Sequence, residues 1–294
     1  MFKKVTVLVL SLLLLFGSMA LAQKTNLQVP YDVEVPDEFA QAPMLDEKVE
    51  NGELPPVSER VPDEPFVVEP RGKIGEYGGT LHSATIDINS WGEDIMFMDV
   101  YNSFVRPSPD GSNLQLSFAK DIEVSEDMST YTIHLREGVK WSDGNDFNTD
   151  DILFWYEDML LNEEYTPAVG QVFKDANGEV MNLTAVDEYT FKVEFGTPKP
   201  FFLNSLVHQV GWNWLHPSHI FKNYHPKYTS EEELQKKVEE NNYDHWYQLL
   251  SYMDTSVGQA YMNVNVPTIG PYKLVEFSSD RRVWERNTYY WKVA

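Results

Sequence analysis

The first 22 residues and the absence of cysteine together set the strictest limits on how this chain can fold. Lys3 and Lys4 precede an apolar run over residues 5–16, and small residues ending in Ala22 follow it. This order is typical of a secretory signal peptide, and the run is too short for a stable transmembrane span. We therefore expect cleavage near Ala22 and a periplasmic or extracellular mature protein, rather than a retained N-terminal anchor. Without cysteine no disulfide can form, so packing and hydrogen bonds must stabilise the exported domain.

The charge and aromatic content of the chain narrow the set of partners. The formal net charge is −23, and such an acidic surface repels nucleic acid phosphates and anionic lipid headgroups. The charge favours solubility and does not by itself select a ligand. Aromatic residues make up 14% of the chain, which suits stacking on sugars or peptide side chains, although most of these rings are expected in the core.

Residues 23–76 form an acidic, proline-rich arm. Residues 32–69 include twelve acidic residues but only two basic ones, Lys48 and Arg60. Eight prolines lie between residues 30 and 70. Proline removes backbone donors, and the apolar residues show no sustained period of 2 or 3.6. We expect an extended strap or linker that is partly disordered, and a spacer rather than a functional tail. Its possible docking points are Phe39, Leu45, Phe66 and Val67.

The globular pattern begins at residue 77 and mixes strands with helices. In the segment 130–135 Tyr131, Ile133 and Leu135 share one face, which predicts a half-buried strand. Turn residues and apolar runs predict further strands over 80–86, 122–124, 183–186, 190–195, 269–277 and 281–286. Helices are predicted over 92–104, from 148 onward, over 201–209, and, as one helix or a pair, over 230–250.

Several polar groups could carry catalysis or bind a metal, and each has a simpler structural interpretation. Asp150 and Asp151 could be paired carboxylates, but adjacent helical residues point about 100° apart, so a role at a helix start explains them better. His216 and His219 could bind a metal, but the intervening Pro217 and the lack of cysteine favour a loop before a helix.

Other candidate motifs are weaker still. His134 lies on a strand face and is expected to be an ordinary half-exposed histidine. The Ser142-Asp143-Gly144 segment predicts a tight turn, and no G-x-S-x-G nucleophile motif, P-loop or dinucleotide fingerprint occurs. We expect no catalytic residue, no metal and no cofactor.

Four ordered blocks of sequence carry a family resemblance. Residues 118–156 read FAKDIEVSEDMSTYTIHLREGVKWSDGNDFNTDDILFWY, and LTAVDEYT, PSHIF and GPYKL with RNTYYW follow at 183–190, 217–221, 270–274 and 286–291. In this order the blocks resemble the extracellular solute-binding proteins of family 5, the oligopeptide-, dipeptide- and nickel-binding type. The chain departs from the family at Ile122 and Glu123, at Met128, which replaces a turn glycine, and at Thr288, which replaces a proline.

The resemblance implies an α/β fold: a lobe of the type II periplasmic-binding kind with an inserted subdomain, over residues 77–294. Members of the family are two-lobed and longer, so the chain looks truncated before the second lobe. The implied function is the substrate-binding component of an ABC importer, which captures an oligopeptide or an oligosaccharide and delivers it to a membrane permease, and which acts as a monomer without nucleic acid. The alternatives are a secreted hydrolase and a truncated, non-binding remnant.

Two groups of residues have the character of a binding site. Trp212, Asn213 and Trp214 offer two indoles and an amide in a loop after an apolar helix. Asn89 and Trp91 follow the first expected strand, and clefts of the family lie at such strand ends. For each tryptophan the alternative is packing in the core. The number of indoles favours an oligosaccharide slightly over a peptide.

Overall fold

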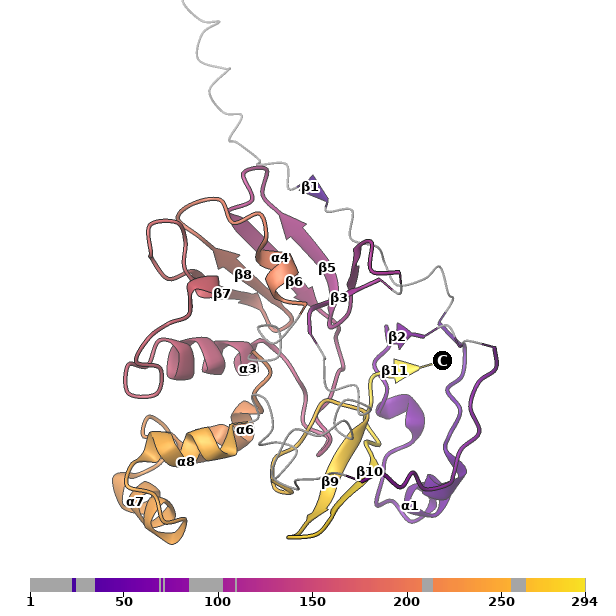
Figure 1. Cartoon of the computed structure of the whole chain (residues 1–294). Helices are drawn as coiled ribbons and strands as arrows, with labels where there is room; N and C mark the ends of the chain where they lie inside the picture. Colours follow the sequence, from indigo (N-terminus) through magenta and orange to yellow (C-terminus); the bar gives the residue numbers. More distant parts are fainter. Residues whose placement is uncertain are drawn as a thin grey trace, which may run out of the picture.

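The computed structural model describes residues 23–24, 35–68, 70, 72–84, 103–108, 110–207, 214–254 and 263–293. At one end lies a five-stranded antiparallel sheet (Figure 1). Its strand order is β1 (Gln23–Lys24), β5 (Ala119–Val124), β6 (Thr130–Leu135), β8 (Thr190–Glu194) and β7 (Asn182–Asp187). The predicted signal peptide at residues 1–22 lies outside the described residues. Within them, no helix combines the length and the apolar character needed to cross a bilayer.

The central strand β6 has the bounds that its alternating pattern predicts. Tyr131, Ile133 and Leu135 are buried, and Ile133 pairs with Ile122 on β5 and with Phe191 on β8. The turn between β5 and β6 holds Met128 at φ 58°, a left-handed conformation that glycine adopts more easily. Met128 therefore adopts the turn conformation expected of the glycine that it replaces.

Both strands of the β7–β8 hairpin were also predicted. Helices pack against this part of the sheet. Helix α3 (Thr149–Leu153) contacts β7 and continues into the wide helical turn η3 (Phe154–Leu160). Asn148 caps α3, since its side-chain oxygen accepts a hydrogen bond from the Asp150 amide at 2.9 Å. Shorter elements complete this part: β3 (Val105–Pro107), β4 (Leu114–Leu116), η4 (Gln171–Phe173) and α4 (Phe202–Ser205).

Below the sheet lie helices α6 (Ser218–Phe221), α7 (Glu231–Glu240) and α8 (Trp246–Met253) and a two-stranded ribbon (Figure 1). Helix α6 leads through η5 (Lys222–Tyr224) to α7 and α8, so the segment 230–250 is a pair of helices. Ser230 caps α7 by accepting from the Glu233 amide. The last predicted strand pair is also present, as the antiparallel ribbon of β9 (Tyr272–Phe277) and β10 (Arg282–Arg286).

The described part of the arm is a docked segment, which corrects the expectation of a partly disordered spacer for residues 35–68. It contains η1 (Pro43–Leu45), α1 (Asp46–Glu50), η2 (Val57–Glu59) and β2 (Phe66–Val67), and β2 pairs in parallel with β11 (Lys292–Val293). Among the expected docking points Leu45, Phe66 and Val67 are buried, while Phe39 is half-buried. The tertiary contacts override a local sequence without periodicity.

Three further predictions do not match the described residues or fall outside them. Residues 80–84 form no strand, and Leu81 is 76% exposed, because no described strand pairs with this segment. The helix predicted over 92–104 lies mostly outside the described residues. The helix predicted over 201–209 ends as α4 at Ser205, and its last residues also lie outside.

Candidate functional site

Of the expected binding residues, Trp214 is described, whereas Asn89, Trp91, Trp212 and Asn213 lie outside the described residues. Trp214 is fully buried. Its indole stacks on Trp155 at a centroid distance of 4.4 Å, and Phe104 meets it edge-on at 5.5 Å. The structure therefore corrects the expectation that Trp214 presents a stacking face to a solute, because aromatic neighbours cover the ring.

Trp214 is instead the centre of an aromatic core. Phe191 of β8, Phe202 of α4 and Phe173 of η4 lie 6.0, 6.2 and 6.1 Å from its ring. Its Nε1–H is buried and has no hydrogen-bond partner among the residues that the structure describes. The core thus fixes Trp214 against both the sheet and the helices.

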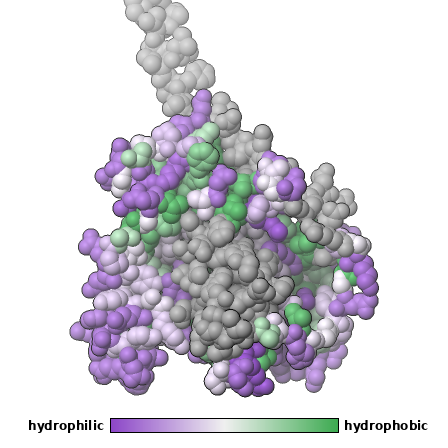
Figure 2. Space-filling view, viewed as in Figure 1, coloured by the Kyte–Doolittle hydropathy of each residue, from purple (hydrophilic) through white to green (hydrophobic). Residues whose placement is uncertain are grey.

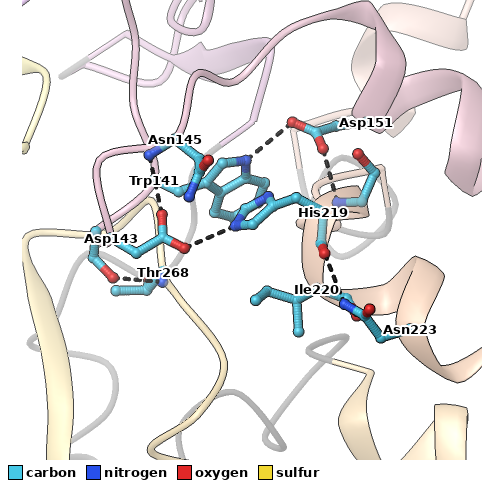
Figure 3. Close-up of polar contacts among 10 residues, drawn as sticks. Trp141, Asp143, Asn145, Asp151, His219, Ile220, Asn223 and Thr268 are labelled. Carbon is cyan, nitrogen blue, oxygen red and sulfur yellow. Dashed lines mark hydrogen bonds and ion pairs between the residues drawn. The ribbon is translucent and has the colours of Figure 1, made fainter.

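A polar seam joins the sheet-bearing part to α6 (Figure 3). The carboxylate of Asp151, on α3, accepts hydrogen bonds from the Trp141 indole Nε1–H at 3.0 Å and from the Ser218 amide at 2.8 Å. Asp151 is 2% exposed. Burial raises the pKa of this carboxyl above its usual range, although the two hydrogen bonds oppose the shift. Asp151 therefore does more than favour the start of α3, because it also fixes the start of α6.

The turn that follows Trp141 makes the exposed side of the same seam. The carboxylate of Asp143 lies 2.7 Å from Nε2 of His219 on α6 (Figure 3). Burial works against the charged form, but the bonds from His219 and Asn145 hold the pKa of Asp143 below its ordinary value. Ser142 exchanges two bonds with Thr268: its amide donates to the Thr268 carbonyl, and its hydroxyl accepts from the Thr268 amide.

The two histidines considered as metal ligands face different partners. Nε2 of His216 lies 2.7 Å from the buried carboxylate of Asp254, whose other oxygen accepts from the Tyr165 hydroxyl at 2.5 Å. Burial, followed by the charge of Asp254, raises the pKa of Tyr165. His219 instead pairs with Asp143. The described part of the chain contains no group of three or more acidic, histidine or cysteine side chains that could hold a metal ion.

The remaining polar candidates have structural partners. Asp150 is exposed beside the helix cap, while the Asp151 carboxylate points into the seam, so the two carboxylates do not face a common site. Nδ1 of His134 lies 3.2 Å from the Thr190 hydroxyl, and the ring is half-exposed as predicted. On the face shown in Figure 2, apolar residues gather over the sheet region, while α7 and α8 are largely hydrophilic.

The fold defines a mixed α/β lobe of a periplasmic binding protein. It is similar to a solved oligopeptide-binding protein OppA, with a TM-score of 0.73 and 34% identity over 87% of this chain and 39% of that chain. It is also similar to the periplasmic binding protein MelB of Agrobacterium fabrum C58, solved with stachyose, with a TM-score of 0.59 and 26% identity over 92% of this chain and 41% of that one.

The chain belongs to the bacterial extracellular solute-binding proteins, family 5, whose model matches residues 113–294. Among curated relatives, the periplasmic alpha-galactoside-binding protein of Rhizobium meliloti is 30% identical over 87% of this chain and 37% of its own length. The periplasmic oligopeptide-binding protein OppA of Salmonella typhimurium is 25% identical over 58% of this chain and 27% of its own length. The chain therefore spans well under half of the length of these relatives, which are periplasmic binding proteins.

Proposed function

We propose that this protein is the substrate-binding component of an ABC importer and that it captures an oligopeptide or an oligosaccharide outside the cytoplasmic membrane. The observation that carries the proposal is the family match over residues 113–294. Both solute classes stay open, since the relatives that match most of this chain include an alpha-galactoside-binding protein and an oligopeptide-binding one. The fold suits a protein that binds between lobes and releases its ligand to a membrane partner.

The proposed cellular setting follows from the same family and from the N-terminal residues. We infer that the signal peptide is cleaved near Ala22, and that the mature protein works as a monomer with a membrane permease. We also infer that the protein is not an enzyme, as expected for a member of a binding-protein family. The intact mass of the protein from its own organism tests the cleavage, because removal of residues 1–22 lowers the mass by a defined amount.

For the binding wall we propose Asn89, Trp91, Trp212 and Asn213. Trp212 and Asn213 immediately precede Trp214, whose burial in the aromatic core supports a rigid anchor for them. Rigid support of this kind makes an indole and an amide effective in a sugar- or peptide-binding site. The role proposed for Trp214 is to support these residues.

Isothermal titration of the native protein with stachyose, raffinose and a set of short peptides tests the function. We expect one class to bind, and we expect Trp212→Ala to weaken that binding at least tenfold, by about 1.4 kcal/mol or more. Trp246→Ala is the matched control, since this partly exposed indole lies on α8 and donates to Glu164. The affinity of this variant for the solute should stay within about threefold of that of the parent protein.

Each negative result has a different meaning. If neither solute class binds or raises the melting temperature, the proposed capture of these solutes is wrong. Turnover of a glycan or a peptide would instead indicate the hydrolase. If a solute binds with equal affinity to Trp212→Ala and to the parent protein, the function stands and the proposed binding wall is wrong.

A further inference from the structure

The strand β11 is held by the arm. Lys292 and Val293 pair in parallel with Phe66 and Val67, and the Val68 amide donates to the Val293 carbonyl at 2.7 Å. Among the described residues β2 is the only strand partner of β11. A ladder of two residues is too short to be stable by itself. Its position must therefore come from the side chains around it.

Arg60 supplies the first of these side-chain contacts. Arg60 is 3% exposed. Its guanidinium donates to the Pro55 carbonyl at 2.9 Å, to the Gln41 side-chain oxygen at 2.6 Å and to the Thr288 carbonyl at 2.5 Å. Burial lowers the pKa of Arg60. The planar, five-donor guanidinium suits several acceptors at once, so Arg60 ties two positions of the arm to residue 288.

Phe66 supplies the second contact. Its ring is 2% exposed and meets Trp291 edge-on at 5.9 Å, and Trp291 in turn stacks on Phe118 near the start of β5 at 4.3 Å. The Arg136 guanidinium lies 5.8 Å from the Phe66 ring and donates to the Glu64 carbonyl at 2.9 Å. The arm, the C-terminal segment and the sheet therefore meet in one packed junction.

A small apolar cluster supplies the third contact. Ala42, Leu45 and Leu54 of the arm are buried together, and Tyr289 packs against them. The Tyr289 ring also lies against the turn that contains Gly144, where an added Cβ would approach the ring to 3.0 Å. This turn carries Asp143, so the cluster brings the arm to the edge of the polar seam.

We propose that residues 40–68 form a strap that holds residues 287–293 in place against the sheet, with Arg60 as its positioning residue. The strap joins parts of the chain 228 residues apart, from Arg60 to Thr288. Its acidic residues point outward, while its single buried cation and its apolar anchors point toward the C-terminal segment. This inference is independent of the solute and of the proposed transport function.

Hydrogen–deuterium exchange of the native protein tests the strap. In Arg60→Ala the amides of residues 288–293 and of the arm should exchange at least about tenfold faster, because the hydrogen bonds of the charged guanidinium to both segments are lost. The amides of β5, β6 and β8 should keep the exchange of the parent protein. Arg60→Lys, which retains the charge and one or two donors, should restore part of the protection.

Arg281→Ala is the matched control. Arg281 is an exposed arginine beside the ribbon that pairs with Glu276, and its loss should leave the exchange of residues 288–293 unchanged. The strap is refuted if Arg60→Ala leaves these amides as protected as in the parent protein. It is equally refuted if protection falls by the same factor in β5, β6 and β8, since Arg60 would then act on the stability of the whole lobe.

Discussion

The sheet and the arm are ordered by different kinds of interaction. In β6 alternate residues are buried, and cross-strand neighbours complete a core around Trp214. The arm 35–68 has only short helical turns and one two-residue strand, and it is ordered by Arg60, Phe66 and a small apolar cluster. The sheet draws on many ladder pairs and buried ring contacts, whereas the arm depends on a few contacts to distant residues. Loss of a single contact should therefore have different consequences in the two regions.

The largest effect is expected in the core of the sheet-bearing part. Trp214→Ala should lower the free energy of unfolding by about 3–5 kcal/mol, because it leaves a cavity among five aromatic rings. Urea unfolding followed by circular dichroism measures the change. Tyr252→Ala on α8, a side chain 40% exposed, is the control and should change it by less than about 0.5 kcal/mol. A loss at Trp214 as small as the control's would remove the contrast between core and arm.

A medium effect is expected at the seam. The Asp151 carboxylate accepts one bond through each oxygen, from the Trp141 indole and from the Ser218 backbone amide. In Asp151→Asn one of these donors must face the side-chain NH2, which cannot accept, so the free energy of unfolding should fall by about 1–3 kcal/mol. Asp150→Asn is the control, since this neighbouring carboxyl is exposed, and its effect should stay below about 1 kcal/mol. Equal losses for both variants would show that the seam contributes no more than a helix terminus does.

The seam variant also has a pH signature. Because the folded pKa of Asp151 is raised, the folded state binds the proton more readily than the unfolded state does. The contribution of Asp151 is then fully present below its unfolded pKa and is lost as pH rises through the folded pKa. The difference in unfolding free energy between the parent and Asp151→Asn should therefore be larger at about pH 4 than at about pH 7. An opposite trend would mean that the hydrogen bonds outweigh burial.

The smallest global effect is expected in the arm. Leu54→Ala removes a buried contact in the cluster with Ala42 and Leu45, but the arm should open before the lobe unfolds. The free energy of global unfolding should change by less than about 1 kcal/mol, while limited proteolysis within residues 40–60 should become faster. Met44→Ala, at a side chain 54% exposed, should alter neither. A large global loss in Leu54→Ala would place the arm and the sheet in one cooperative unit.

The elements that were predicted well from the sequence are those with a recognisable pattern within a short stretch of residues. The alternation of Tyr131, Ile133 and Leu135 predicted β6, and turn residues predicted the β7–β8 hairpin and the β9–β10 ribbon. Three of the docking points expected in the arm, Leu45, Phe66 and Val67, are buried, but the role of Arg60 could not be predicted. Arg60 binds backbone carbonyls and an amide, groups that leave no mark in composition or periodicity. The strand expected over 80–86 was wrong for residues 80–84, since a strand needs a partner that local sequence does not reveal.

The candidate site was less predictable than the fold. A tryptophan after an apolar helix is compatible with a cleft and with a core, and only the surrounding rings show that Trp214 is buried. The role of Asp151 was also missed, because its partners Trp141 and Ser218 come from separate segments. The available signal for this contact was the spacing of Trp141 and Asp151, which lie ten positions apart with a turn and a helix cap between them. The binding wall proposed at Asn89, Trp91, Trp212 and Asn213 stays a prediction.

The span of the strap has a consequence for the order of folding. Closing a flexible loop between Arg60 and Thr288 would cost about 5 kcal/mol in chain entropy, far more than a short turn costs. That cost falls only when the sheet and helices between them have already formed. During synthesis the arm emerges long before residues 287–293, so it must wait for them. The junction should therefore be among the last contacts to form, and substitutions there should accelerate its opening while leaving the folding rate of the lobe almost unchanged.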